Sequence, residues 1–273
     1  MILVTGATGN VGGEVVKHLT QRGESVRALV RGERELPKGV EPVIGDLGDP
    51  AGLKTAFDGV RGVFLLGGYP DMPGALAVMR DAGVEHVALL SSRSVVGGQE
   101  SNAVVATHLA AERAVRESGL AWTFVRASGF MSNALQWLPQ LREGDVIREP
   151  FADVAIAAID PYDIAAVVAV ALTSEGHAAQ AYAVTGPAAI LPADRVRVLA
   201  EVLGRDLRLE PQSDEDARAE MSKTTPPQYV DAFFRFFVDG EFDDSPVTTT
   251  VRDLTGRAPR TFADWAAARF PRP

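Results

Sequence analysis

Two hydrophobic periods alternate along the first half of this chain. Short apolar, β-prone runs are each followed by a longer segment in which apolar positions recur every three or four residues. The runs predict strands at 2–5, 25–30, 43–44, 63–66, 86–90 and 122–125, and the longer segments predict helices at 13–19, 50–57, 73–82 and 103–117. This alternation predicts an α/β fold built on a parallel, doubly wound sheet.

The turn after the first strand is rich in glycine and reads Gly6-Ala7-Thr8-Gly9-Asn10-Val11-Gly12. Glycine permits a tight turn, lets backbone N–H groups approach a pyrophosphate, and allows close contact between helix and strand. A diphosphate there would lie at the positive end of the helix. An ordinary strand–helix turn is the alternative, but the position on the first strand favours a Rossmann dinucleotide site. We therefore expect cofactor contacts from Gly6, Thr8, Gly9, Asn10, Val11 and Gly12.

Beyond residue 130 the pattern is less regular. Strands are expected at 154–159 and 181–185, a helix and loop at 132–144, and helices at 161–172, 192–203, 213–220, 229–238 and 261–269. We expect a Rossmann core in residues 1–130, with a strand and a helix contributed from about 151–187. Residues 131–273 would form a smaller, mostly helical C-terminal lobe that binds the substrate over the sheet edge.

Composition narrows the possible partners. The chain has 273 residues, a net charge of −9 and no cysteine. The negative charge argues against nucleic acid or an anionic membrane, and the lack of cysteine removes disulfides, thiolate nucleophiles and Cys-ligated metals. No apolar run approaches the length of a membrane span, the chain begins inside its first strand, and no histidine pair has metal-ligand spacing. We expect a cytoplasmic monomer or homodimer that binds small molecules and no metal.

Several motifs together resemble the NmrA-like atypical short-chain dehydrogenase/reductases. They are the glycine turn at 6–12, Arg31, and the segments 45–47, 118–126, 129–133 and 255–262, which together span essentially the whole chain. That family includes NAD(P)H-dependent quinone reductases, reductases of plant phenolics, and members that only sense the nicotinamide cofactor. The resemblance implies NAD(P) binding, with further cofactor contacts from Leu66, Gly67, Ser91, Ser128, Gly129 and Phe130.

The end of the second strand bears on the choice between NAD and NADP. An acidic residue there would bond the ribose 2′-hydroxyl of NAD, but this strand is followed by Arg31, whose guanidinium can pair with the 2′-phosphate of NADP. We expect NADP(H) to be preferred and NAD(H) to be possible, because Glu33 and Glu35 dilute the positive charge; a solvated surface arginine is the alternative. Asp46 and Leu47 resemble the family pair that contacts adenine, although such an aspartate could equally serve a turn or cap a helix.

The usual catalytic acid of the superfamily is missing. When the glutamate that follows the superfamily's tyrosine–lysine pair is aligned with Glu112, Val104 takes the place of the tyrosine and His108 that of the lysine. Ser92 matches the serine that hydrogen-bonds the substrate carbonyl. The resemblance thus implies catalytic roles for Ser92 and His108. His108 would donate a hydrogen bond or proton, or hold the nicotinamide ribose, unless it faces the cofactor without chemical duty.

A quinone needs less help from an acid than a simple ketone does. Hydride attack on a ketone forms an alkoxide, whereas attack on a quinone forms a phenolate-like anion with a pKa of about 10, roughly six units below that of water. We therefore expect hydride transfer from NAD(P)H to a quinone or other conjugated aromatic acceptor. A non-catalytic NADP(H) sensor and an oxygenase acting on an aromatic polyketide remain as alternatives.

The acceptor pocket is expected where the loop 128–133 meets the C-terminal lobe. Substrate contacts are expected from Tyr69, Val104, Met131, Trp137 and Phe151. The aromatic run 233–237 is a candidate lid or dimer contact, although an aromatic run on a helix more often belongs to the core.

Overall fold

The computed structural model describes residues 1–270 and confirms the expected α/β fold. Seven parallel strands form one sheet in the order β3-β2-β1-β4-β5-β6-β8. They are β1 (Ile2–Val4), β2 (Val26–Val30), β3 (Glu41–Ile44), β4 (Gly62–Leu66), β5 (His86–Ser92), β6 (Ala121–Ala127) and β8 (Gln180–Val184). The strand order reverses between β1 and β4, so the crevice at their carboxyl ends is the position where such sheets bind ligands.

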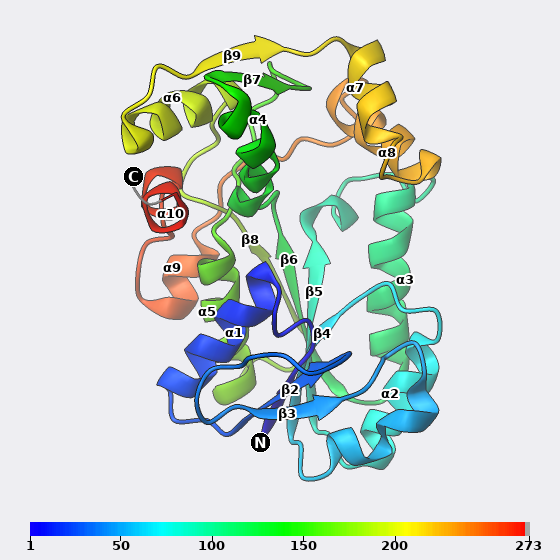
Figure 1. Ribbon diagram of the computed structural model, residues 1–273. Helices are drawn as coiled ribbons and strands as arrows, with labels where there is room; N and C mark the ends of the chain where they lie inside the picture. Colours follow the sequence, from blue (N-terminus) through cyan, green and yellow to red (C-terminus); the bar gives the residue numbers. More distant parts are fainter. Residues whose placement is uncertain (271–273) are drawn as a thin grey trace.

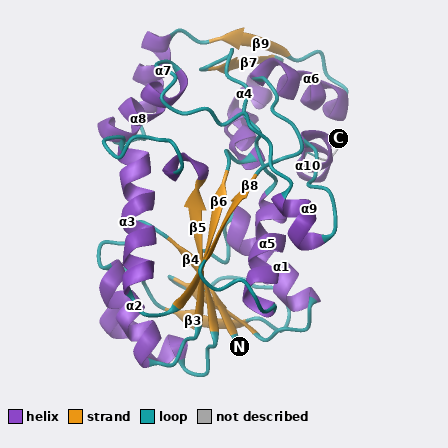
Figure 2. Cartoon of the chain, turned by 180° about the vertical axis from the view of Figure 1, so that it is seen from behind, coloured by secondary structure: helices purple, strands orange, loops and turns teal. Residues whose placement is uncertain are grey.

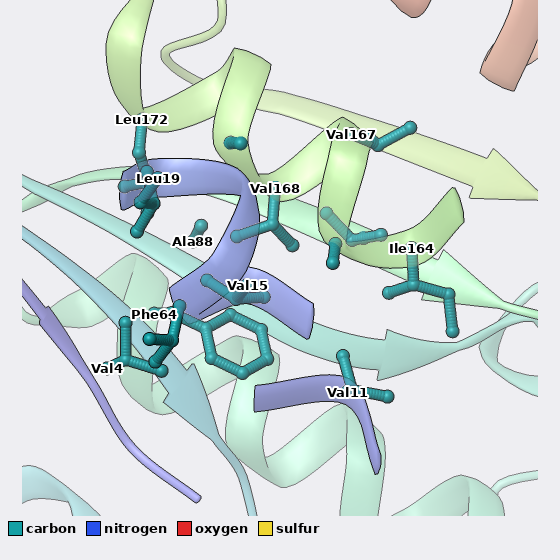
Figure 3. Close-up of a cluster of buried hydrophobic side chains, with 14 of the residues drawn as sticks. Val4, Val11, Val15, Leu19, Phe64, Ala88, Ile164, Val167, Val168 and Leu172 are labelled. Atoms are coloured by element: carbon teal, nitrogen blue, oxygen red, sulfur yellow. The ribbon is translucent and has the colours of Figure 1, made fainter. Parts of the chain in front are cut away.

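One face of the sheet is covered by α1 (Asn10–Gln21) and α5 (Pro161–Thr173), which pack against each other. Leu19 of α1 lies beside Leu172 of α5 and Val15 beside Val168, and Phe64 of β4 belongs to the same cluster; all five side chains are buried (Figure 3). Each such burial contributes roughly 1.5–3 kcal/mol. Helix α5 is apolar on nearly every side because the sheet, α1 and α9 (Thr250–Thr255) enclose it. Within residues 1–270, no helix is both long enough and apolar enough to cross a membrane.

The opposite face carries the 3₁₀ helix η1 (Pro50–Phe57), α2 (Met72–Asp81) and α3 (Ala103–Glu117). Figure 2 shows α2 and α3 on one side of the sheet and α1 and α5 on the other. Leu3 faces the α2 side while its neighbours Ile2 and Val4 face α1, because successive side chains of a strand point to opposite faces. The central strands β1, β2 and β4 are therefore buried on both sides, as their continuous apolar runs predict.

A smaller lobe lies beyond the carboxyl ends of β5, β6 and β8 (Figure 1). It contains η3 (Met131–Trp137), α4 (Leu138–Glu143), β7 (Val146–Glu149), α6 (Pro192–Leu203), β9 (Arg208–Pro211), α7 (Asp214–Met221), α8 (Pro227–Phe237) and α10 (Phe262–Arg269). The lobe has a core of its own, in which Trp137 and Trp265 are almost fully buried. The acidic run forms α7, capped by the Ser213 side chain, as expected.

Two features of the lobe differ from the expectation. The strand predicted at 154–159 does not form; isolated bridges join Ile156 to Ile190 and Ile159 to Phe130 instead. The backbone of this segment is divided among different partners, since the Ala157 N–H donates to the Asp244 carbonyl and the Ile159 N–H to the Gly129 carbonyl. The structure also contains a two-stranded parallel sheet of β7 and β9 that the sequence pattern did not indicate.

The motif at 255–262 fastens the C-terminal segment to the start of α5. Asp163, which is fully buried, receives the Arg257 guanidinium at 2.8 Å and the Arg260 backbone N–H at 2.7 Å. The Arg260 guanidinium carbon lies 3.4 Å from the centre of the Tyr162 ring. Thr261 and Asp264 then form a capping box that starts α10. The motif at 255–262 therefore has a structural role, because it holds the C-terminal segment against α5.

Candidate active site

The glycine turn lies at the carboxyl end of β1. Gly6 has a φ of +59°, and a Cβ at Gly12 would lie 2.2 Å from the Gly6 carbonyl oxygen. Helix α1 begins at Gly9 without a side-chain cap or an acidic residue in its first turn, so no side chain competes for its N-terminal N–H groups. Thr8, Gly9 and Asn10 are exposed beside this helix terminus. The turn thus fits a pyrophosphate in shape and charge.

The glycine turn is joined directly to the end of β4. The Leu66 N–H donates to Thr5 Oγ1 at 3.0 Å, and a Cβ at Gly6 would lie 2.6 Å from Leu66 Cδ1. Leu66 and Gly67 in turn line a cavity that lies at the carboxyl end of the sheet. The diphosphate cradle and this cavity are therefore neighbours, as the two halves of a dinucleotide site must be.

The other side of the glycine turn carries the residues expected to bind the adenosine. Arg31 is exposed and forms no ion pair with any residue from 1 to 270. Asp46 is exposed, and its Oδ1 accepts the Gly48 N–H at 2.8 Å, so it does serve a turn. Leu47 is buried in the core beneath the loop, where its side chain cannot pack on an exposed ring. Tyr69 belongs to this region: burial raises the pKa of its hydroxyl, and Asp46 and Arg31 both act on it.

The cavity, of about 800 Å³, lies between the carboxyl ends of β4, β5 and β6 and the lobe. Its size is typical of a small-molecule site. The strand ends form one wall, which contains Leu66, Gly67, Leu90, Ser91, Ser92, Ser128, Gly129 and Phe130. A second wall is aromatic and contains Phe151, Phe233, Phe236, Phe237 and Phe242. The lining also includes three charged residues, Glu149, Arg195 and Asp244. Six residues predicted to contact the cofactor from 66 to 130 thus share one cavity.

Helix α3 supplies the wall that holds a tyrosine and a lysine in the wider superfamily. Val104 and His108 both line the cavity, one turn apart. The His108 imidazole forms no hydrogen bond with the described chain. Burial lowers its pKa below the ordinary value of 6.5, and the nearby Glu112 carboxylate opposes that shift. His108 is therefore a neutral imidazole near pH 7, free to donate one hydrogen bond into the cavity.

The end of β5 presents two serines with different surroundings. Ser91 Oγ donates to Glu112 Oε1 at 2.8 Å, so its proton is committed to that carboxylate. Ser92 Oγ accepts the Ser94 N–H at 3.1 Å and lies 2.9 Å from Ser94 Oγ. Because Ser94 can donate to it, the Ser92 hydroxyl can direct its own proton into the cavity. This is the geometry required of a residue that hydrogen-bonds a carbonyl oxygen.

The loop between α8 and α9 contributes Asp244, which the sequence pattern did not single out. Its Oδ2 accepts both the Ser128 hydroxyl and the Gly129 N–H at 2.8 Å, and its Oδ1 receives Arg93 at 3.1 Å. Burial raises the pKa of Asp244, and these donors oppose the shift. The carboxylate fixes the loop after β6, on which the expected cofactor residues stand.

Helix α8 closes the cavity on the side away from the cofactor turn. Phe233, Phe236 and Phe237 line the cavity, whereas Phe234 packs beneath them in a small core. The helix is held by Asn102, the buried cap of α3, whose Nδ2 donates to the Ala232 carbonyl at 3.0 Å. The aromatic run therefore serves both the core and the cavity wall.

Only two of the five residues expected to contact the substrate line the cavity. Val104 and Phe151 line it, and Phe151 has a φ of +55°, a strained conformation that turns its backbone beside the cavity. Met131 and Trp137 lie in the lobe core, and Tyr69 lies on the adenosine side. Trp137 reaches the site indirectly, because its Nε1 donates to Glu149 Oε2 at 2.6 Å.

Arg195 and Glu149 are, like Asp244, charged cavity residues that the sequence interpretation missed. Both side chains are more than nine-tenths buried. Neither lies in a motif, and Arg195 stands on a helix that was expected at 192–203 without any functional assignment. A buried arginine on such a helix becomes recognisable only when the elements around it are known.

Comparisons with known proteins agree with this geometry. Residues 6–175 match the family described as NAD(P)H-binding. The chain is 41% identical, over 98% of its length and 97% of the relative's, to a (4-alkanoyl-5-oxo-2,5-dihydrofuran-3-yl)methyl phosphate reductase of Streptomyces griseus. It is 35% identical, over 98% and 97%, to an NAD(P)H azoreductase of Xenophilus azovorans.

Solved structures share the fold. A quinone oxidoreductase of Escherichia coli, crystallised with NADPH, superposes with a TM-score of 0.80 over 99% of this chain and 100% of that chain, at 24% identity. The family match covers the glycine turn, the strand ends and α3, and the relatives named above extend the similarity through the lobe. The chain therefore belongs to the NAD(P)H-binding family and is an NAD(P)H-dependent oxidoreductase.

Proposed function

We propose that this enzyme transfers hydride from NADPH to a conjugated acceptor whose reduction leaves a stabilised anion, such as a quinone or an electron-poor carbon–carbon double bond. The observation that carries the proposal is the α3 wall of the cavity. Val104 and His108 stand there, and no tyrosine of residues 1–270 lines the cavity. The space beside them accommodates a planar acceptor, which a purely cofactor-sensing protein would not need.

The chemistry of the acceptor follows from this wall. When bound, reduced nicotinamide supplies a hydride. A simple ketone would then require a proton at once, because an alkoxide is a strong base. A quinone yields a phenolate-like anion with a pKa of about 10, which water can protonate later. An acceptor of this class makes a strong acid in the cavity unnecessary.

His108 and Ser92 are the residues assigned to the developing anion. A neutral imidazole donates a hydrogen bond without delivering a full proton, and the Ser92 hydroxyl supplies a second donor. Such preorganised donors stabilise charge that appears only in the transition state. The aromatic wall formed by Phe151, Phe233 and Phe237 would hold a flat acceptor by stacking.

The names of two relatives describe acceptors of this kind. An azo group is conjugated, and a 4-alkanoyl-5-oxo-2,5-dihydrofuran contains a ring double bond conjugated with two carbonyl groups. Hydride addition to that double bond would leave an enolate shared by both carbonyls. Such an anion, like a phenolate, needs no strong acid. We therefore extend the proposed acceptors from quinones to acyl-substituted unsaturated lactones.

A preference for NADPH is proposed on the basis of Arg31. The guanidinium is exposed and unpaired at the end of β2, and the charges of Arg31 and Asp46 both influence Tyr69. An unpaired arginine can form charge-assisted hydrogen bonds with a 2′-phosphate. The exposed Glu33 and Glu35 dilute the positive charge there, so NADH can be used more weakly.

The test is anaerobic oxidation of NADPH and NADH with three acceptors: 1,4-naphthoquinone, a 3-acyl butenolide and cyclohexanone. The proposal expects turnover with at least one of the two conjugated acceptors and at least about 100-fold less with the ketone, because only the ketone needs an acid in the transition state. Equal turnover of the ketone would contradict the proposed acceptor class. Tight cofactor binding without any turnover would favour a sensor, and a requirement for oxygen would favour an oxygenase.

A further inference from the structure

The lobe end of the cavity contains an arginine whose side-chain nitrogen atoms form no hydrogen bond with the described protein. Arg195 stands in the first turn of α6, is 7% exposed, and lines the cavity beside Pro192. Its guanidinium forms no hydrogen bond or ion pair with residues 1–270, and its Nε is buried without an acceptor. A buried guanidinium without acceptors is costly, so its retention at a cavity wall indicates a ligand.

The other arginine buried to this degree shows how the chain satisfies such a group when it is structural. Arg27 is 9% exposed, and its Nε donates to Glu41 at 3.0 Å while its terminal nitrogen donates to the Ala56 and Asp58 carbonyls at 2.9 and 2.8 Å. Arg195 has no equivalent of these three bonds. The contrast separates a structural arginine, whose donors the protein satisfies, from Arg195, whose side-chain donors it leaves unsatisfied.

The countercharge that acts on Arg195 is Glu149, but the Glu149 carboxylate is already engaged by other donors. Glu149 Oε2 accepts the Trp137 indole N–H at 2.6 Å, and Gln136 Nε2 lies 3.2 and 3.1 Å from the two oxygens. Glu149 acts on Arg195 through its charge without forming an ion pair with it. Trp137 also supports the guanidinium, whose carbon lies 5.6 Å from the indole centre. These contacts orient Arg195 and leave its donors open.

We propose that Arg195 is an anion-binding subsite of the acceptor cavity and that it recognises a phosphate monoester carried by the acceptor. The inference rests on the proposed reductase function and specifies the substrate class of the same site. A phosphate accepts the parallel N–H bonds of a guanidinium, and the phenylalanine wall strengthens the pair by excluding water. The conjugated nucleus would lie between this subsite and the α3 wall, so Arg195 sets the orientation of the acceptor.

The test compares two probes that differ only in the phosphoryl group, 2-(hydroxymethyl)-1,4-naphthoquinone and its phosphate monoester. The wild-type enzyme is expected to have a KM at least about tenfold lower for the ester. Arg195→Met should raise the KM for the ester by about 10- to 100-fold, the usual range for a charge-assisted bond, and change that for the alcohol by less than about threefold. Arg195→Lys should restore part of the difference. The matched control is Arg197→Met, which removes an exposed arginine of the same helix.

A purely structural role makes a different prediction. If Arg195 only balances Glu149, then Arg195→Met should lower the thermal midpoint and alter both probes equally, and the double variant with Glu149→Gln should recover the midpoint. That result, or equal KM values for the two probes in the wild type, would overturn the subsite.

If neither probe is reduced, the reductase proposal fails, and calorimetry decides the subsite separately. If the ester binds to the NADP⁺-loaded wild type and Arg195→Met abolishes this binding, the subsite is supported. If Arg195→Met leaves the binding unchanged, the subsite is overturned.

Discussion

His108 and Glu112 lie one turn apart on α3, and only Glu112 is satisfied by the protein. The Glu112 carboxylate is fully buried and accepts hydrogen bonds from Ser91, Arg116 and Arg126, while the His108 imidazole has no partner among residues 1–270. One turn of helix thus carries a fixed, neutralised carboxylate behind the wall and an uncommitted donor facing the cavity.

Replacement of His108 tests whether it is a donor or an acid. Because burial lowers its pKa below 6.5, the imidazole is neutral above that pH, and its N–H is available at every higher pH. The account predicts a pH-independent kcat from about pH 6.5 to 8.5. We expect His108→Ala to lower kcat by about 10- to 100-fold and His108→Gln, which keeps an N–H donor, to lower it much less. A kcat that falls steadily as pH rises, with both variants equally impaired, would identify an imidazolium acid instead.

Arg31→Ala should alter cofactor choice with little effect on chemistry. Loss of the guanidinium removes a partner of the 2′-phosphate, so the KM for NADPH should rise by about tenfold while that for NADH and the kcat stay within about twofold. Steady-state kinetics with each cofactor measure this. Lys38→Ala, a change at another exposed cation between β2 and β3, is the control and should leave both KM values unchanged. Parallel increases for NADPH and NADH with Arg31→Ala would remove the assigned role.

Glu112 should contribute stability that acid removes. Burial alone would raise its pKa, but the hydrogen bonds from Arg126 and Ser91 and the charges of Arg126 and Arg116 outweigh that effect and lower it. Unfolding therefore takes up a proton at this site, and the contribution is present above the ordinary value of 4.5 and declines as pH falls below it. Glu112→Gln should lower the free energy of unfolding by about 1–3 kcal/mol at pH 7.

Urea denaturation at pH 7 and pH 3.5 measures this contribution. The difference between wild type and Glu112→Gln should shrink at the lower pH, because below pH 4.5 the carboxyl of the unfolded wild type takes up a proton before that of the native state does. A difference that grows with acid would show that the sign of the pKa shift is opposite. Activity of the variant at low temperature separates loss of folding from loss of the Ser91 contact.

Gly12→Ala should disrupt the cofactor turn. The new methyl group would meet the Gly6 carbonyl oxygen at 2.2 Å, so the turn must shift, and overpacking of this kind costs about 1–3 kcal/mol. Fluorescence titration with NADPH should show at least about tenfold weaker binding, because the N–H groups of α1 move with the turn. Gly32→Ala places its methyl group in open space and should bind NADPH normally. Normal binding by Gly12→Ala would mean that the diphosphate lies elsewhere.

The sequence was sufficient for the sheet and for the shape of the glycine turn, because both depend on local patterns. Apolar runs indicate buried strands directly, and Gly6 and Gly12 mark a turn that other residues cannot form. The strand expected at 154–159 was wrong because its backbone pairs with the distant segment at Asp244, which local periodicity does not reveal. The sheet of β7 and β9 was missed for the same reason, since each strand has only four residues.

The acceptor end could not be predicted to the same extent. Trp137 is aromatic and adjacent to the expected loop, yet its side chain is buried in the lobe core. Glu149 and Arg195, which Trp137 contacts, line the cavity instead. Met131 is buried in the same core. Whether an aromatic residue faces a cavity or a core depends on how the lobe elements pack, and the sequence period is the same in both cases.

Isotope tracing tests the central claim most directly. NADPH deuterated separately on each face of nicotinamide C4 is incubated without oxygen with a 3-acyl butenolide, in which the position that receives hydride does not exchange with water. The account predicts a reduced product with one deuterium at the ring carbon β to both carbonyl groups, from one labelled form only, with a primary isotope effect on single-turnover hydride transfer. Reduced butenolide without deuterium from either form would show that hydride does not pass directly from the cofactor to the acceptor.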